Sequence, residues 1–158
     1  MILIPGTKST ISDLKWLRQS GLEAAVLKAA ASGTLVFGIC GGYQMLGRTV
    51  SDPNQVEAAG VTEIAGMGLL PMDTVFHGEK VQTQTSGIFA GIEGMLSGLN
   101  GISFEGYEIH MGRSPESLNP VTGSSNVYGS YIHGIFDAPG VTDTILKTLC
   151  QQKGIDFE

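Results

Sequence analysis

Continuous apolar runs and amphipathic segments alternate along the first quarter of the chain, which predicts strands separated by helices. Residues 2–4 and 35–39 are short, uninterrupted apolar runs that end at proline or glycine, as in strands buried on both faces. Between them, residues 10–20 and 22–32 repeat apolar side chains at helical spacing, and each segment is followed by a glycine stop signal. Strand, helix and strand in this order predict a βαβ unit in a parallel sheet.

The pattern changes after residue 65. Residues 73–77 and 80–85 are β-rich pieces joined through Gly78, and similar pieces recur at 104–111 and 129–136, which favours antiparallel hairpins. The other segments are assigned by composition and spacing: an exposed loop at 113–125, a closing helix at 141–151, and a capping box at Thr10-Ile11-Ser12-Asp13. The fold class predicted is α/β.

Length and charge narrow the possible roles. A chain of 158 residues suits one domain, and 42% apolar with 15% charged residues is typical of a compact fold. The net charge of −6 argues against nucleic acid or an anionic membrane as partner. No apolar run comes near the roughly 18 residues of a membrane span, and residues 1–5 lack the pattern of a signal peptide, so we expect neither feature. With only Cys40 and Cys150 as cysteines, we expect a cytoplasmic location.

The first predicted strand begins at residue 2, with no βα neighbour before it. A parallel sheet of two or three strands would be poorly covered. We therefore expect residues 1–158 to be one domain that lacks its first strands.

Candidate chemistry centres on Gly38-Ile39-Cys40-Gly41-Gly42-Tyr43-Gln44, which follows a buried strand and precedes a helix. A sharp strand-to-helix turn exposes a nucleophile and leaves room only for glycine beside it. The helix start should lower the pKa of Cys40, and the N–H of Gly41 should face a developing oxyanion. The alternative is an inert buried cysteine.

Three histidines are candidates for the base. His133 stands at the end of an apolar stretch and before Gly134, where a catalytic side chain is expected at a strand end. An apolar surrounding is also typical of a histidine that belongs to the core. His110 is a weaker candidate for a site role, and His77 is weaker still.

The motif Gly38-x-Cys40-x-Gly42-x-Gln44 resembles that of class I (triad-type) glutamine amidotransferases. Further stretches in the same order are similar to the cobyric acid synthase family: residues 3–10, 13–18, 36–47, 66–71, 107–113 and 131–136. The resemblance covers nearly the whole chain. It implies a flavodoxin-like fold, with a parallel sheet flanked by helices.

The resemblance also implies roles for particular residues. Cys40 would be the nucleophile and His133 the base, while the turn at Gly6 would supply a second oxyanion donor beside Gly41. Many relatives carry a glutamate two residues after the histidine, but Ile135 stands there, and Glu108 is either a substitute or structural. Three residues are candidates for binding glutamine: Gln44, Tyr43 (otherwise packing) and Arg113 (otherwise a solvated loop residue).

The implied function is a glutaminase domain that releases ammonia for ATP-dependent amidation of corrinoid carboxylates in cobalamin biosynthesis. Its partner would be an N-terminal synthetase domain that carries ATP and magnesium; this domain would hold no cofactor or metal, and alone it would be weakly active or inactive. Two alternatives stay open. One is the glutaminase of a related amidotransferase, for example one acting on a peptidoglycan precursor, and the other is a non-catalytic docking module.

Overall fold

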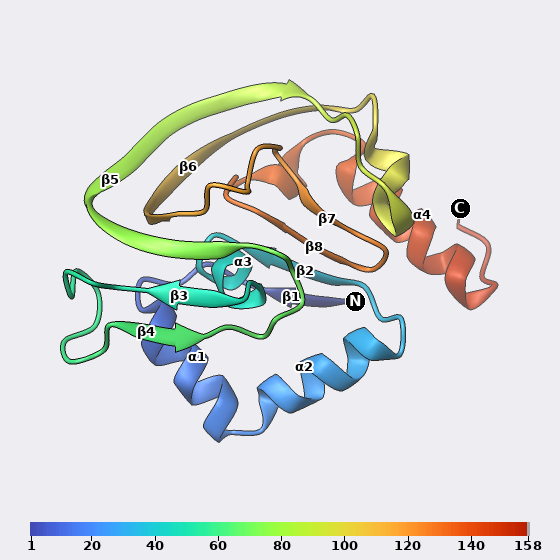
Figure 1. The fold of residues 1–158 in the computed structure, drawn as a ribbon. Coiled ribbons are helices and arrows are strands. Elements are labelled where there is room, and N and C mark those ends of the chain that lie inside the picture. The colour runs from blue at the N-terminus through green and yellow to red at the C-terminus, as the bar shows by residue number, and fades with distance from the viewer. Residues whose placement is uncertain (158) are drawn as a thin grey trace.

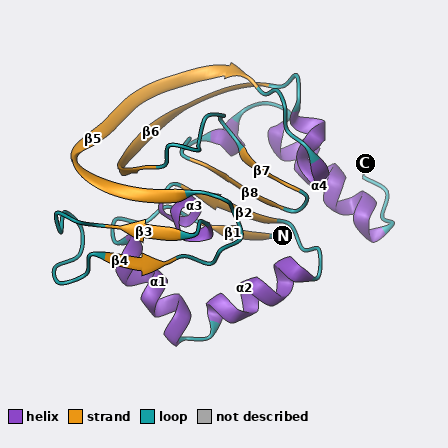
Figure 2. Cartoon of the chain, viewed as in Figure 1, coloured by secondary structure: helices purple, strands orange, loops and turns teal. Residues whose placement is uncertain are grey.

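The computed structural model describes residues 1–157, which form two four-stranded sheets with helices beside them (Figures 1 and 2). The strands are β1 Ile2–Ile4, β2 Val36–Ile39, β3 Thr49–Ser51, β4 Glu63–Ala65, β5 Asp73–Ile88, β6 Ser103–Arg113, β7 Thr122–Ser124 and β8 Val127–Ser130. The α-helices are α1 Thr10–Gln19, α2 Leu22–Ala31, α3 Gly41–Leu46 and α4 Val141–Lys153, and short 3-10 helices cover Gly94–Leu99 and Ile135–Asp137. None of the helices within residues 1–157 has the length and apolar character needed to cross a bilayer.

The first sheet carries the predicted parallel βαβ unit. Its strand order is β1-β2-β8-β7, and β1, β2 and β8 run parallel, with Gly38 of β2 opposite Ile4 on one side and Gly129 on the other. Parallel strands place their carboxyl ends at one edge of the sheet. The segments that follow β1, β2 and β8 therefore meet, and these are the segments that contain Gly6, Cys40 and His133.

Both faces of this sheet are covered, as the continuous apolar runs predict. Val36 packs with α1 and α2 through Leu14 and Val26, while its neighbour Phe37 faces the cluster that includes Ile145 of α4. Figure 1 shows α2 and α4 lying apart, with the first sheet between them. Full burial of one such side chain stabilises the fold by about 1.5–3 kcal/mol, so the apolar side chains on both faces hold the strands of this sheet together.

The second sheet, of order β4-β3-β5-β6, contains a long antiparallel ribbon of β5 and β6 that arches over the first sheet (Figure 1). The predicted pieces 73–77 and 80–85 are parts of one strand, β5, with an irregularity in pairing between Phe76 and Val81. The hairpin expected between them does not form, because β6 pairs with both pieces.

Three further sequence predictions were wrong in detail. Of the predicted piece 129–136, only residues 129 and 130 lie in a strand, β8, which pairs antiparallel with β7, as expected of a hairpin, but also in parallel with β2. The loop 113–125 contains β7, which pairs with β8. The capping box does not form: the N-cap of α1 is Ser9, and Thr10 instead donates its hydroxyl to Gln44 Oε1 at 3.2 Å. The pairing of β8 with β2 and the contact of Thr10 with Gln44 join residues far apart in the chain, which the local sequence does not encode.

The outer edge of β1 has no strand partner within residues 1–157. Large apolar side chains lie exposed beside it, with Leu3 47% and Trp16 59% accessible. Strand edges and apolar patches of this kind favour pairing with further polypeptide.

Candidate active site

Cys40 occupies the turn between β2 and α3, and its backbone is strained. Its φ of 50° and ψ of −110° lie in a region that side chains other than glycine rarely adopt. Two hydrogen bonds hold it there: its N–H donates to the Ser130 carbonyl at 2.8 Å, and its carbonyl accepts from Gln44 N–H at 2.9 Å. Strain of this kind is typical of a nucleophile presented by a strand-to-helix turn.

Glycines around this turn allow backbone to pass directly over backbone. A Cβ on Gly42 would lie 2.1 Å from the Ile4 carbonyl oxygen, and one on Gly38 would lie 2.6 Å from the Gly42 carbonyl oxygen. Neither contact is sterically possible, and a backbone oxygen cannot move aside as a flexible side chain would. The glycine requirement predicted from the motif is therefore explained by close approach of β1, β2 and α3.

His133 lies beside Cys40, and Gly6 lies between them. A Cβ on Gly6 would be 3.2 Å from His133 Cε1 and 3.5 Å from Cys40 Cβ. His133 follows β8 and precedes Gly134, whose φ of 79° turns the chain, as predicted for a strand-end residue. Its backbone exchanges two hydrogen bonds with Tyr107 of β6, and its ring stacks on the Tyr107 ring at a centroid distance of 5.1 Å.

The two predicted oxyanion donors flank the cysteine. Hydrogen bonding by the Gly41 N–H acts to lower the pKa of the Cys40 thiol, as expected of a group that stabilises negative charge. Within residues 1–157 the Gly6 N–H makes no hydrogen bond. An N–H that is free beside a nucleophile is available for a developing negative charge.

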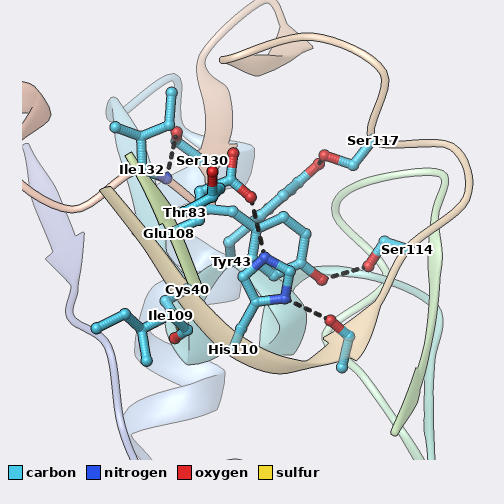
Figure 3. Close-up of polar contacts among 12 residues, drawn as sticks. Cys40, Tyr43, Thr83, Glu108, Ile109, His110, Ser114, Ser117, Ser130 and Ile132 are labelled. Atoms are coloured by element: carbon cyan, nitrogen blue, oxygen red, sulfur yellow. Dashed lines mark hydrogen bonds and ion pairs between the residues drawn. The ribbon is translucent and has the colours of Figure 1, made fainter. Parts of the chain in front are cut away.

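The protonation states differ from the prediction for Cys40. Burial raises the pKa of the Cys40 thiol, the Gly41 N–H opposes this rise, and the carboxylates of Glu108 and Glu57 add to it. The expected lowering is wrong because Cys40 is buried, with 6% of the residue exposed, and loss of water outweighs the effect of the short helix that follows. The thiol also lies 3.5 Å from the Ile109 carbonyl oxygen, to which an S–H can donate (Figure 3).

Burial also lowers the pKa of His133, and His110 lowers it further. A neutral imidazole is able to accept the thiol proton. Burial of the two groups therefore favours a neutral thiol and a neutral imidazole in the free protein.

Position 135 provides no carboxylate to orient His133, as predicted from the sequence. Ile135 is 1% exposed and packs in the apolar core. Glu108 bonds to His110 instead, with 3.0 Å between the carboxylate and Nε2, while Nδ1 lies 2.6 Å from the Gly112 carbonyl (Figure 3). Of the two readings of Glu108, the structure supports a partner of His110 over a substitute triad member.

Gln44 belongs to a buried polar network that connects α3 to the second sheet. Its Nε2 donates to the Tyr131 hydroxyl at 3.3 Å, and that hydroxyl bonds to Ser114 Oγ at 2.6 Å, which bonds to Thr74 at 2.8 Å. Burial raises the pKa of Tyr131 to about 12, so the phenol stays neutral. Local sequence gave no signal of this network, because its members are far apart in the chain.

A cavity of about 340 Å³ opens beside Cys40 and Gln44. Charged side chains of both signs line it: Lys8, Lys80 and Glu57. Burial raises the pKa of Glu57, whose Oε1 accepts from the Ile11 N–H at 2.8 Å. The sequence analysis missed Lys80 and Glu57, which reach the cavity from the ribbon and from the loop after β3.

Other residues predicted from the sequence lie elsewhere. Tyr43 is fully buried in the core, donates to Ser117 Oγ at 2.9 Å and does not line this cavity, which fits the packing alternative. Arg113 is exposed and lies 3.4 Å from Glu79, and His77 is exposed on β5. His110 lines the cavity and stacks on Tyr131 at 4.0 Å.

Comparison with known families shows which family the chain belongs to. Residues 1–141 match the CobB/CobQ-like glutamine amidotransferase domain. The chain belongs to this family. The Cys40 turn and the neighbouring His133 are therefore the candidate site of a glutamine amidotransferase domain.

Similar curated proteins are cobyric acid synthases. The chain is 51% identical over 183 residues to that of Lachnoclostridium phytofermentans, covering 100% of this chain and 35% of the relative. The corresponding protein of Ruminiclostridium cellulolyticum is 44% identical over 177 residues, covering 100% and 34%. The chain thus spans about a third of the length of these relatives.

A solved structure described as a glutamine amidotransferase supports the fold assignment. It superposes with a TM-score of 0.54 at 16% identity, covering 97% of this chain and 78% of the other. At that identity the likeness concerns the fold alone, and it confirms the predicted α/β class.

Proposed function

We propose that this domain hydrolyses glutamine to glutamate and ammonia at Cys40, and that it supplies the ammonia to a synthetase domain of a cobyric acid synthase. The observation that carries the first part is the strained Cys40 turn, with His133 on the far side of Gly6. The second part is supported by the cobyric acid synthases that match the chain over 98–100% of its length. There, ammonia would amidate corrinoid carboxylates with ATP and magnesium bound by the synthetase portion.

The reaction follows from the protonation states. His133 takes the Cys40 proton as the sulfur bonds to the side-chain carbonyl carbon of glutamine, and the N–H groups of Gly41 and Gly6 stabilise the oxyanion. The carbon–nitrogen bond then breaks, and the nitrogen takes the proton from His133 and leaves as ammonia. Water next attacks the thioester, and its proton passes to His133. The carbon–sulfur bond then breaks to release glutamate, and the sulfur takes the proton back from His133, which restores the neutral thiol and imidazole.

Charges in the 340 Å³ cavity suit the free amino-acid end of glutamine. Lys8 and Lys80 would attract the α-carboxylate, and Glu57 would pair with the α-ammonium. Because burial raises the pKa of Glu57, a bound cation would stabilise its charged form. Gln44 lines the same cavity, and hydrogen bonds with Thr10 and Tyr131 hold its amide in one orientation. The amide would therefore favour a substrate group with matching hydrogen-bonding character.

Two expectations about context belong to this proposal. The domain would act in the cytoplasm, where Cys40 and Cys150 stay reduced. It would turn glutamine over weakly by itself, since the open edge and exposed apolar side chains beside β1 lie next to the oxyanion turn at Gly6.

The test compares two nitrogen sources in the polypeptide that contains this domain and its synthetase portion. Cys40→Ser should abolish amidation from glutamine and leave amidation from added ammonium salts unchanged. Cys150→Ser, on α4, is the matched control and should retain both. If Cys40→Ser still draws nitrogen from glutamine at a normal rate, the proposal is wrong.

A further inference from the structure

The outer edge of β6 contacts both the nucleophile and the base. The backbone of Tyr107 exchanges two hydrogen bonds with the backbone of His133, at 3.2 and 2.8 Å. Two residues further along, the Ile109 carbonyl oxygen lies 3.5 Å from the Cys40 sulfur. Backbone groups of alternate residues point to the same edge of a strand, so one edge reaches both reacting residues. A shift of this short stretch would therefore change how the nucleophile and the base lie relative to each other.

Glu108 and His110 flank Ile109 and form an ion pair on one face of β6. The Glu108 carboxylate lies 3.0 Å from His110 Nε2, and the other ring nitrogen, Nδ1, lies 2.6 Å from the Gly112 carbonyl oxygen (Figure 3). A carboxylate and a carbonyl are both acceptors, so a proton must lie on each side of the ring. His110 thus has no free lone pair to accept the thiol proton, which leaves His133 as the base.

The ring of His110 is also held from a third direction. Its side chain is 7% exposed and stacks on the Tyr131 ring at a centroid distance of 4.0 Å. The Tyr131 hydroxyl accepts a hydrogen bond from Gln44, which belongs to the helix that begins directly after Cys40. Three contacts on a buried ring leave it little freedom, so the ion pair connects β6 to the helix that follows the nucleophile.

We propose that Glu108 and His110 are positioning residues for the glutaminase reaction, because their ion pair fixes the edge of β6 that contacts both the nucleophile and the base. This inference rests on the proposed function. It adds a role for two residues that neither form bonds with the substrate nor carry its protons.

The charges of the pair act on the same two groups. The Glu108 carboxylate raises the pKa of the Cys40 thiol, and His110 lowers the pKa of His133. Removing the Glu108 charge should therefore make the thiolate easier to form. Loss of the ion pair should at the same time loosen the edge of β6 and slow the reaction. The two consequences have opposite signs, so they can be measured apart.

The test measures turnover and thiol reactivity in the polypeptide that contains this domain and its synthetase portion. Glu108→Gln keeps the shape of the side chain and removes its charge. It should lower kcat for glutamine hydrolysis about tenfold, with KM changed by less than about twofold. Alkylation of Cys40 by iodoacetamide, in a Cys150→Ser background, should have a lower pH midpoint. A thiol that ionises more readily but turns over more slowly indicates lost positioning.

A second variant tests whether the two residues act as a unit. His110→Asn keeps a donor near the position of Nδ1 and removes the contact with Glu108, and it should also lower kcat about tenfold. The double variant Glu108→Gln/His110→Asn should be about as slow as the slower single variant, because the ion pair can be lost only once. His110→Gln is a milder change and should show a smaller slowing if His110→Asn does not fold.

The matched control is Glu105→Gln, which removes the same charge from an exposed position on the same strand, outside the cavity beside Cys40. It should leave kcat, KM and the alkylation midpoint unchanged. Lys8, Lys80 and Glu57, the charged side chains that line this cavity from other elements, are the same in every variant.

Four results from a protein that hydrolyses glutamine would overturn the inference alone. Unchanged kcat in both single variants would show that the pair positions nothing, and losses that multiply in the double variant would show that its members act separately. A rise in KM at unchanged kcat would assign the pair to glutamine binding. A higher alkylation midpoint in Glu108→Gln would attribute the slowing to a less acidic thiol. If the unsubstituted protein hydrolyses no glutamine, the proposed function fails, and the inference fails with it.

Discussion

The β2–α3 turn and the β5–β6 ribbon both border the candidate site, but they are held in different ways. In the turn, backbone packs on backbone, and the Cβ that Gly42 lacks would lie 2.1 Å from a carbonyl oxygen. Along the ribbon most side chains of β5 are exposed, and a Cβ on Gly78 would meet nothing within 4 Å. The turn thus fixes the position of the nucleophile. The ribbon instead contributes exposed side chains that can be substituted without displacing backbone and that determine the charge of the site and access to it.

The sharpest contrast is expected from one methyl group added to each region. Gly42→Ala should lower the free energy of unfolding by about 3 kcal/mol or more and abolish activity, because β1 and α3 must separate to admit the new Cβ. Gly78→Ala should stay within about 0.5 kcal/mol of the unsubstituted chain. Urea denaturation followed by circular dichroism measures both. Similar losses at the two positions would show that the turn is no more constrained than the ribbon.

Removing the base should affect chemistry more than stability. His133→Ala is expected to slow glutamine hydrolysis by about 10²- to 10⁴-fold, because the thiol and the leaving nitrogen then lack a proton carrier. His133 is only partly buried, so the melting temperature should fall by less than about 4 °C. His77→Ala, at an exposed position on β5, is the control for both measurements. A variant that keeps its activity, or that melts far lower, would place His133 in the core and outside the chemistry.

A smaller effect is expected from the charge that the ribbon contributes. Lys80→Gln should raise the KM for glutamine about tenfold, equivalent to roughly 1.4 kcal/mol, with kcat little changed, since a carboxylate contact is lost. Arg113→Gln should leave KM unchanged, because Arg113 lies against Glu79 and outside the cavity. Steady-state kinetics distinguish them. A larger rise in KM for Arg113→Gln than for Lys80→Gln would identify Arg113 as the residue that binds the carboxylate.

The smallest expected effect is a shift in the pH at which the Cys40 thiol is half alkylated. Burial raises the pKa of the Cys40 thiol, so its alkylation by iodoacetamide should increase with pH and reach half its maximum above about pH 8.5, the ordinary value for cysteine. The measurement uses a Cys150→Ser background, so that one thiol reacts. In urea the midpoint should move down to the ordinary value. A midpoint below about pH 8.5 in the folded chain would mean that the helix start stabilises the thiolate after all.

Local sequence predicted those parts of the site that depend on neighbours in the chain. The glycines on either side of Cys40 indicate by themselves that backbone passes close by, and the glycine after His133 indicates a turn with positive φ. The parallel pairing of β1 with β2 likewise followed from two short apolar runs separated by helices.

Residues brought together by distant pairing were not predicted. Lys80 enters the cavity only because β5 is a single long strand, and Glu57 does so through its contact with the Ile11 N–H. The pKa of Cys40 was predicted in the wrong direction for the same reason, since burial by β6 and the neighbouring carboxylates is a tertiary effect. Patterns of neighbouring residues contain no information about which distant strand will cover a turn.

Chemical mapping of the acyl intermediate tests the central assignment most directly. The polypeptide that contains this domain is mixed with glutamine, quenched in acid and digested, and the mass of each cysteine-containing peptide is measured. The assignment predicts a γ-glutamyl adduct on the peptide that carries Cys40 and none on the peptide that carries Cys150. Glutamate formation without an adduct on Cys40, or with an adduct on another residue, would contradict it.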